Sequence, residues 1–593
     1  MPPSLQTPFL NYPTAVETNG QGTEFKYKSQ YFPVLTGFKL NILSYIATSL
    51  SPVQSILWNA AESGTPAKLE RKGVLKNVVP CFDPTVIPLV PRDSSLSAYD
   101  PFLHDANSTQ SQFYSALDYV EAYKSRKTTP IKVVERILDI LSTDSTKESY
   151  FISLVPRHIL LAEAAKSTER YVLGTPLPLD GVPLAVKDEV DVKGLMKTFG
   201  LSLEQVKRRF KDGGEPSTYT SFCVQKLLDA GMLLLGKTNM HELGLDTTND
   251  NPYWGTPCNP YNPNYYPGGS SGGSGASVGA GLVPIAVGAD GGGSVRVPSA
   301  YNGAWGLKPS HGRVSTSPSP SFAPSVVVVG PIAATISDLE IAYHIMATPD
   351  TDGSLSGLFA PPRSLSLPAQ KRIGIYNPWI DASEPKVKIL FNSSLTLLKE
   401  KMGYQVEDIT LPYLSENQIA HRLVIMSELT SILCSAGQDI TGLAPHNRIL
   451  ASVASRTSSH DLISANRLRT QMMQHLSHLF TTYPGLIILS PTTPHPGVRI
   501  PSGAGLKGAY GLTDATNAVE SMIYVFLANW TGCPSISVPC GYVDVHAGEM
   551  PVGLMGMSEW GSEDLLLRFG RDWDEIWSTQ RRRGKGWVDV LNS

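Results

Sequence analysis

A glycine- and serine-rich segment constrains this chain more than any other feature. It runs from Pro267 to Gly281 and, after a short interruption, continues from Gly288 to Pro298. Such composition is typical of a flexible linker. The interruption at 282–287, however, is an apolar run that predicts a core strand, and the second half contains the isolated charges Asp290 and Arg296. A linker requires neither feature, so we interpret the segment as folded and functional.

The rest of the chain predicts an alternation of strands and helices. Apolar runs predict core strands, and apolar residues at helical spacing predict helices. The strands are expected at 181–186, 232–235, 372–376, 405–411, 486–489 and 535–538, and the helices at 129–141, 221–230, 386–402, 416–435 and 461–482. This order favours an α/β fold in which a mixed sheet is covered by helices on both faces. Residues 1–110 predict short helices and a proline-rich extended stretch, so we expect an extension that packs on a main domain at 111–593.

Charge and cysteine content argue against several classes of partner. The net charge of the 593-residue chain is -3 and no long basic run occurs, which argues against nucleic acid. The six cysteines are scattered without a CxxC pair, so we expect neither disulfides nor a bound metal. We find no secretory signal and no segment that predicts a transmembrane helix. We therefore expect an intracellular protein, either cytoplasmic or peripherally bound to a membrane.

The segment Phe38–Trp58 is the best candidate for membrane contact. It predicts one or two short amphipathic helices that are broken at Pro52. Such helices pack on the body of a protein or lie in the membrane interface, and the sequence leaves both readings open.

The glycine–serine segment suits the cleavage of a carbonyl compound. Three consecutive glycines, Gly291, Gly292 and Gly293, precede Ser294, and their N–H groups can converge on an oxyanion. A serine hydroxyl becomes a good nucleophile only when a base takes its proton. No nearby histidine belongs to a triad signature, whereas Lys187 ends an apolar strand. A lysine acts as a base only when it is uncharged, which burial favours, although strand-end lysines more often reach solvent.

Three motifs together resemble the amidase signature family. They are 181–188, which ends in Lys187-Asp188, then 267–274 around Ser270, and 290–298 around Ser294. The resemblance extends from about residue 115 to near residue 580, and the 24-residue spacing of the two serines matches the family. It implies a mixed, mostly parallel sheet of about eleven strands sandwiched between helices.

The same resemblance implies a mechanism without a cofactor. Ser294 is expected to be the nucleophile, Ser270 to relay its proton across a cis Gly269–Ser270 peptide, and Lys187 to be the terminal base. Gly291, Gly292 and Gly293 are expected to hold the oxyanion. Ser271, Asp290 and Arg296 are expected to support this machinery from behind.

Other segments resemble the plant-type fatty acid amide hydrolases of that family. They include 35–39, 119–137 and 241–248. This likeness implies hydrolysis of acyl amides such as N-acylethanolamines, N-terminal helices that line an acyl channel and contact the membrane, and a homodimer. It also implies that Leu245 and Thr247 line the substrate site. Two departures, at Asn302–Trp305 and in an insertion of about eight residues around Ser202–Ser217, are expected to reshape the pocket.

Several alternatives remain open at this stage. A general amidase for short-chain or aromatic amides and an amidotransferase A-type subunit would use the same chemistry, and an inactive binding protein would keep only the fold. Two motif matches are set aside. Gly231–Thr238 fits a phosphate-binding loop, but its variable positions predict a buried strand. Gly268–Gly272 fits a nucleophile elbow, but the preceding 259–267 is broken by prolines and predicts no strand.

Overall fold

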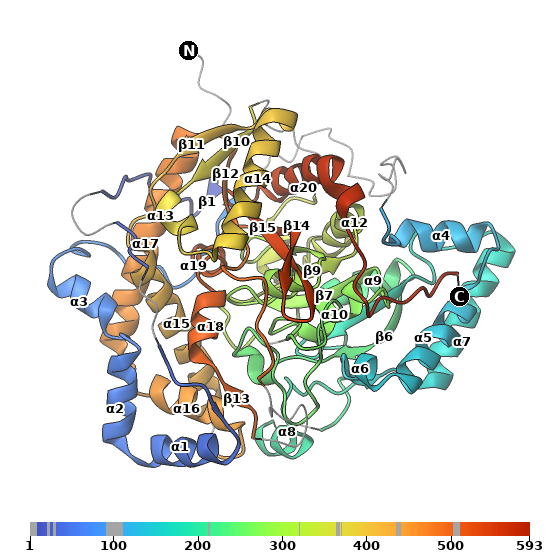
Figure 1. Cartoon of the computed structure of the whole chain (residues 1–593), viewed down its shortest axis with the longest axis horizontal. Helices are drawn as coiled ribbons and strands as arrows, with labels where there is room; N and C mark the ends of the chain where they lie inside the picture. The colour runs from blue at the N-terminus through green and yellow to red at the C-terminus, as the bar shows by residue number, and fades with distance from the viewer. Residues whose placement is uncertain are drawn as a thin grey trace.

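The computed structural model of the 593-residue chain describes residues 9–19, 24–27, 31–89, 111–210, 214–319, 321–362, 368, 370–434, 440–501 and 510–592. Figure 1 shows a central sheet surrounded by helices, with the N-terminal helices on one flank. The expected domain boundary at 110/111 falls at the end of residues 90–110, which lie outside the described residues.

The central sheet has eleven strands. In spatial order they are β11 (Gln405–Asp408), β10 (Arg372–Ile375), β12 (Leu486–Pro491), β15 (Gly548–Met557), β14 (Ser535–Val545), β8 (Trp305–Lys308), β9 (Val328–Ala333), β7 (Ile285–Asp290), β5 (Pro183–Lys187), β6 (Leu233–Thr238) and β4 (Phe151–Leu154). The core strands expected from apolar runs all lie in this sheet. The segment that resembled a phosphate-binding loop is indeed largely buried strand β6.

The sheet is mixed, as expected, but it is not mostly parallel. Parallel pairing occurs in two separate groups, β11–β10–β12 and β7–β5–β6. The strands between these groups pair antiparallel. The physical reason is connection length. Only His546 and Ala547 join β14 to β15, and so short a link permits an antiparallel pair but not a parallel one.

The helices between residues 116 and 577 surround the sheet. They are α4 (Ala116–Lys124), α5 (Pro130–Thr143), α6 (Ser145–Glu148), α7 (Arg157–Leu173), α8 (Leu203–Arg209), α9 (Phe222–Asp229), α10 (Gly272–Gly279), α11 (Arg296–Tyr301), α12 (Ile336–Met346), α13 (Asn377–Ile380), α14 (Pro385–Met402), α15 (Leu414–Cys434), α16 (Pro445–Ala454), α17 (Ser459–Thr482), α18 (Ala515–Ser521), α19 (Phe526–Thr531) and α20 (Glu563–Trp577). The five helices predicted from periodicity are α5, α9, α14, α15 and α17. In α5, Pro130 occupies the first turn, and the Thr129 hydroxyl accepts a hydrogen bond from the Lys132 N–H.

Strand β12 shows that both faces of the sheet are covered. Its side chains alternate between the two faces. Ile487 and Leu489 belong to the apolar cluster that includes α14 and α20. Leu486 and Ile488 belong to a second cluster, which includes α15, α17 and α19. A strand buried on both sides explains why this part of the sequence is a continuous apolar run rather than an alternating one.

The N-terminal region adds three helices to one flank of the molecule (Figure 1). They are α1 (Gly37–Ser49), α2 (Ser51–Ala60) and α3 (Thr65–Arg71). The expected break in 38–58 falls at Leu50, and Pro52 lies in the first turn of α2. Helix α1 packs against α16, and α3 packs against α15 and α17. Two short antiparallel pairs, β1 (Phe9–Leu10) with β3 (Ile87–Pro88) and β2 (Leu35–Thr36) with β13 (Leu512–Thr513), also join this region to the rest.

Large apolar side chains are exposed on α1 and α2. Phe38, Ile42, Tyr45 and Ile56 are exposed, whereas Leu40 and Ala47 face inward and are fully buried. None of the helices in the described ranges is both long enough and apolar enough to cross a bilayer.

Candidate active site

Lys187 is buried at the end of β5, where its amine contacts three groups. Nζ lies 2.8 Å from the Ser270 Oγ and donates to the Ala289 carbonyl oxygen at 3.1 Å. The Glu189 Oε1 lies 3.0 Å from the same nitrogen. Because β5 pairs with β7, the strand that precedes the second glycine segment, the sheet brings the lysine to the two glycine–serine loops. The side chain is only 1% exposed, so it does not reach bulk solvent.

Ser270 follows a glycine that has no room for a side chain. The Gly269–Ser270 peptide is cis, as the family resemblance implied. A Cβ on Gly269 would lie 2.8 Å from both the Asp246 carbonyl oxygen and the Asn249 nitrogen. Helix α10 begins at Gly272, directly after this turn. The serine is therefore held between the start of a helix and the backbone of 246–249.

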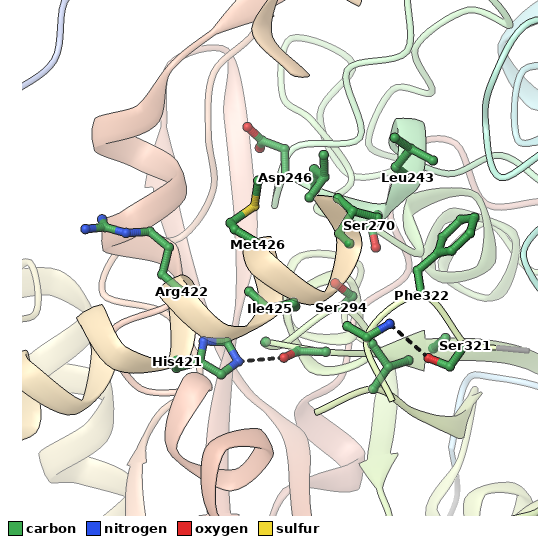
Figure 2. A pocket seen from close by; sticks show the side chains of 18 of the residues that line it. Leu243, Asp246, Ser270, Ser294, Ser321, Phe322, His421, Arg422, Ile425 and Met426 are labelled. Atoms are coloured by element: carbon green, nitrogen blue, oxygen red, sulfur yellow. Dashed lines mark hydrogen bonds between the residues drawn. The ribbon is translucent and has the colours of Figure 1, made fainter. Parts of the chain in front are cut away.

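Ser294 closes the loop that follows β7. It is partly exposed, while the preceding glycines are buried. Gly293 has a φ of 115°, and a Cβ there would lie 2.4 Å from the Val525 side chain, so only glycine fits. Figure 2 shows the hydroxyls of Ser270 and Ser294 pointing toward the same part of a pocket.

Asp290 and Arg296 hold this loop from behind. Both side chains are fully buried, with Arg296 Nε 3.0 Å from Asp290 Oδ2 and Arg296 NH2 3.0 Å from Asp290 Oδ1. The carboxylate also accepts the N–H groups of Gly293 at 2.6 Å and Val295 at 3.1 Å. Burial alone would raise the pKa of Asp290, but Arg296 and these N–H groups hold it well below its usual range.

Ser271 ties the two glycine loops together. Its N–H donates to the Ser294 carbonyl oxygen at 3.3 Å, and its hydroxyl donates to the Ala289 carbonyl oxygen at 3.2 Å. The Ala289 oxygen therefore accepts from both Ser271 and Lys187. The three residues expected to support the site therefore all make hydrogen bonds within the loops that carry Ser270 and Ser294.

The two serines and the lysine line a large pocket of about 670 Å³. The expected substrate-site residues Leu245 and Thr247 also line it. Most of its wall is apolar and comes from distant segments: Leu43 on α1, Leu57 and Trp58 on α2, Ile425, Met426 and Leu429 on α15, and Ile449, Leu450 and Val453 on α16. The N-terminal helices and the glycine–serine loops thus enclose one cavity. Figure 2 shows Ile425 and Met426 of α15 beside the serines.

The two departures from the family pattern differ in their relation to the pocket. Asn302 and Trp305 do not line it, so the expectation that they reshape it is wrong. Asn302 donates to the Pro267 and Pro298 carbonyl oxygens, and Trp305 is buried in the apolar core on β8.

The insertion does reach the wall of the pocket. Its described part includes α8, and Phe210, which directly follows α8, packs on Phe199 and Phe322. Phe199 and Phe322 line the pocket, and their ring centroids are 4.1 Å apart. Residues 211–213 of the insertion lie outside the described residues.

Several pocket residues were not found from the sequence. His421 on α15 contacts the Gly291 carbonyl oxygen through Nε2 at 2.7 Å (Figure 2). Glu189 lies two residues after Lys187, a strand spacing that would have placed it on the same side. Asp246 and His446 also line the pocket. His421 and His446 lie far from the motifs along the chain, in helices without a local signature, so no sequence pattern pointed to them.

Within the described ranges, no three or more His, Cys, Asp or Glu side chains are grouped so that they could hold a metal ion. The groups closest to the two serines are the buried Lys187 amine and the backbone N–H groups of the glycine loop.

The chain is similar to several known proteins. A family model described as Amidase matches residues 132–567. The chain is 33% identical to a fatty acid amide hydrolase of Medicago truncatula, over 84% of this chain and 82% of that protein. It is 30% identical to the A-type subunit of glutamyl-tRNA(Gln) amidotransferase from Thermus thermophilus, over 75% of this chain and 93% of that protein. A solved bacterial aryl acylamidase of the amidase signature family has a TM-score of 0.67 at 25% identity and covers 81% of this chain and 98% of that one.

The fold and these matches together define a class, the enzymes that hydrolyse amide bonds. Within that class, the chain belongs to the amidase family. The resemblance inferred from the three motifs and the likeness to plant fatty acid amide hydrolases are both confirmed.

Proposed function

We propose that this enzyme hydrolyses fatty acid amides, such as N-acylethanolamines, to a free acid and an amine through an acyl-enzyme on Ser294. One observation carries the proposal. The Lys187 amine lies 2.8 Å from the Ser270 hydroxyl at the edge of a largely apolar pocket that Ser294 also lines. A base, a relay and a nucleophile are thus available where a long acyl chain has room to bind.

The proposed proton path runs from Ser294 through Ser270 to Lys187. In its uncharged form, Lys187 accepts the Ser270 proton while Ser270 accepts the Ser294 proton, and the Ser294 Oγ attacks the amide carbonyl carbon. When the C–N bond breaks, the proton returns through Ser270 to the leaving nitrogen. Water then cleaves the acyl-enzyme by the same path, releasing the acid and restoring Ser294.

The sequence predicted three glycines as oxyanion donors, but we propose only two of them. The Gly293 N–H already donates to Asp290 at 2.6 Å, which leaves the N–H groups of Gly291 and Gly292 for the substrate oxygen. The His421 contact with the Gly291 carbonyl oxygen fixes the orientation of that peptide from the other side. Such preorganised donors stabilise the negative charge that develops in the transition state.

The apolar wall and the relatives support a long acyl chain. Leu57, Ile449 and Val453 extend the pocket from the serines toward the N-terminal helices. The Medicago truncatula relative is named for fatty acid amides. The alternative is a general amidase for short-chain or aromatic amides, which the Phe199–Phe322 pair on the wall favours.

We also propose that residues 1–110 form an extension packed on a catalytic domain at 111–593. In this proposal α1 and α2 contact a membrane surface through Phe38, Ile42, Tyr45 and Ile56, whose exposed side chains form an apolar outer face. The protein is further proposed to be a homodimer, on the family likeness alone, and the expected intracellular location remains a separate proposal.

The test is the release of free acid from a series of N-acylethanolamines, from acetyl to arachidonoyl, with Ser294→Ala as the blank. Rates that rise with chain length are expected. Activity confined to the shortest or to aromatic amides would instead establish the general amidase. Glutamine hydrolysis with co-purifying subunits would indicate an amidotransferase, and inactivity on every amide would reject the proposed function.

A further inference from the structure

The pocket contains a polar recess that the proposed mechanism does not use. His446, in the first turn of α16, lines the pocket and is only 3% exposed. Neither of its ring nitrogens has a hydrogen-bond partner among the described residues. Burial and the neighbouring His241 lower the pKa of His446 to about 3, so the ring is neutral near pH 7. A neutral imidazole offers one N–H donor and one bare nitrogen acceptor.

Two further polar groups with unused hydrogen-bonding capacity face the same recess. The Asp246 Oδ1 accepts hydrogen bonds from the N–H and hydroxyl of Thr248, at 2.9 and 3.0 Å. The Thr247 backbone N–H also donates to this carboxylate. A carboxylate has about four acceptor sites, so Asp246 can accept a further hydrogen bond. The Thr247 hydroxyl is buried and has no hydrogen-bond partner in the described part of the chain. Asp246 and Thr247 both line the pocket.

This recess adjoins Ser270. The Asp246 carbonyl oxygen packs against Gly269, the residue before the serine. The backbone N–H of His241 donates to the Ser270 carbonyl oxygen at 3.2 Å. The centroid of the His241 ring lies 5.0 Å from that of the His446 ring. Figure 2 shows Asp246 and Ser270 on the same side of the pocket. In the proposed mechanism Ser270 returns the proton to the leaving nitrogen, so the amine portion of the substrate must lie on this side.

We infer that Asp246, Thr247 and His446 form a subsite that binds a hydroxyl group on the amine portion of the substrate. The inference rests on the proposed function, because it assigns the amine side from the Ser270 proton transfer. Buried polar groups in native proteins almost always have a partner, so three neighbours with unused hydrogen-bonding capacity indicate a missing ligand or water.

A hydroxyl fits this recess better than other groups. It has one donor and two acceptor sites, so it donates to Asp246 or the bare imidazole nitrogen and accepts from the imidazole N–H. An ammonium group only donates and would leave the imidazole N–H unpaired. An alkyl group would leave the capacity of all three side chains unused.

The test compares three amides of one long acyl chain, the N-(2-hydroxyethyl), N-propyl and N-(2-aminoethyl) amides, by kcat/KM. The wild type is expected to prefer the hydroxyethyl amide over the propyl amide by about tenfold or more, because a site built to bind a hydroxyl rejects the analogue that lacks it. His446→Leu should bring this ratio close to one. His446→Gln, which keeps a donor and an acceptor, should restore part of it. His478→Leu on α17, which lies outside the pocket, is the matched control and should keep the wild-type ratio.

Asp246→Asn is the second variant if His446→Leu does not fold, since it keeps an oxygen acceptor for Thr248 and replaces the other carboxylate oxygen with an amide nitrogen. It should lower the ratio as well. A wild-type ratio near one, a ratio unchanged in both variants, or a preference for the aminoethyl amide would overturn the inference while hydrolysis of the propyl amide upheld the proposed function. Failure to hydrolyse any of the three amides would reject the proposed function and the inference with it.

Discussion

Two walls of one pocket are built on different principles. The serine wall, at the ends of β5 and β7, is held by specific hydrogen bonds such as Lys187–Ser270 and by the buried Asp290–Arg296 pair. The helical wall, from α1, α2, α15 and α16, offers mainly apolar side chains. Hydrogen bonds depend on the position of single atoms, whereas apolar contact depends on area and volume. We therefore expect changes in the serine wall to abolish turnover and changes in the helical wall to alter which substrate is preferred.

The largest effect is expected for Ser294→Ala. Losing the proposed nucleophile should lower kcat by about 10⁴-fold or more, since the acyl-enzyme can no longer form. The thermal unfolding temperature should stay close to wild type, because the change removes one oxygen at a partly exposed position. Ser299→Ala is the control, since the hydroxyl of this buried serine donates to the Val295 carbonyl oxygen and the residue does not line the pocket. A Ser294→Ala enzyme with substantial activity would refute the assigned nucleophile.

Lys187→Met should come next, with a loss of kcat of about 10³-fold, in the range that general bases contribute. The substitution removes the amine 2.8 Å from Ser270 but keeps a side chain of similar length. Lys237→Met is the informative contrast. Lys237 is also buried, but it donates to the Asp188 carbonyl oxygen, so its loss should mainly lower the free energy of unfolding. If both variants lost stability and activity equally, Lys187 would be structural rather than the base.

Arg296→Met tests whether the serine wall depends on its buried ion pair. It leaves the Asp290 carboxylate buried without its cation, which should lower the free energy of unfolding by about 3–5 kcal/mol in urea titrations at pH 7. The double variant Asp290→Asn/Arg296→Met should recover part of this loss, because no uncompensated charge remains. Equal loss in the single and double variants would contradict this explanation.

The pH dependence of that variant follows from the pKa of Asp290. In the wild type this pKa lies below its unfolded value, so the stabilisation is complete above about pH 4 and is lost only as the pH falls through the folded pKa. Without Arg296, we expect the effect of burial to exceed that of the remaining N–H donors and to raise the pKa of Asp290 above its unfolded value. The variant is then penalised at pH 7, and the penalty shrinks as the pH falls through the raised value. The difference from wild type should therefore be smaller at pH 5 than at pH 7.

The contrast between the walls also explains what the sequence could predict. Lys187, Ser270 and Ser294 belong to short motifs that end or follow apolar strands, so local pattern and family resemblance both pointed to them. His421 and His446 lie on α15 and α16, and only the packing of these helices brings them to the pocket. Strand positions were readable from apolar runs, but strand direction was not, because it depends on connections such as the short link between β14 and β15. Asn302 and Trp305 were misjudged because a sequence position does not reveal which side of an element faces the pocket.

The smallest effect is expected from filling the helical wall. Leu57 on α2 lines the pocket, whereas the adjacent Ile56 points outward and is 66% exposed. Leu57→Trp should lower kcat/KM for long-chain N-acylethanolamines by about tenfold relative to short-chain ones, since the added ring occupies space that the acyl chain needs. Ile56→Trp adds the same ring outside the pocket and should leave the chain-length preference unchanged. If Leu57→Trp slowed short and long substrates equally, the helical wall would affect catalysis itself. The assignment of turnover to the serine wall and of substrate preference to the helical wall would then be wrong.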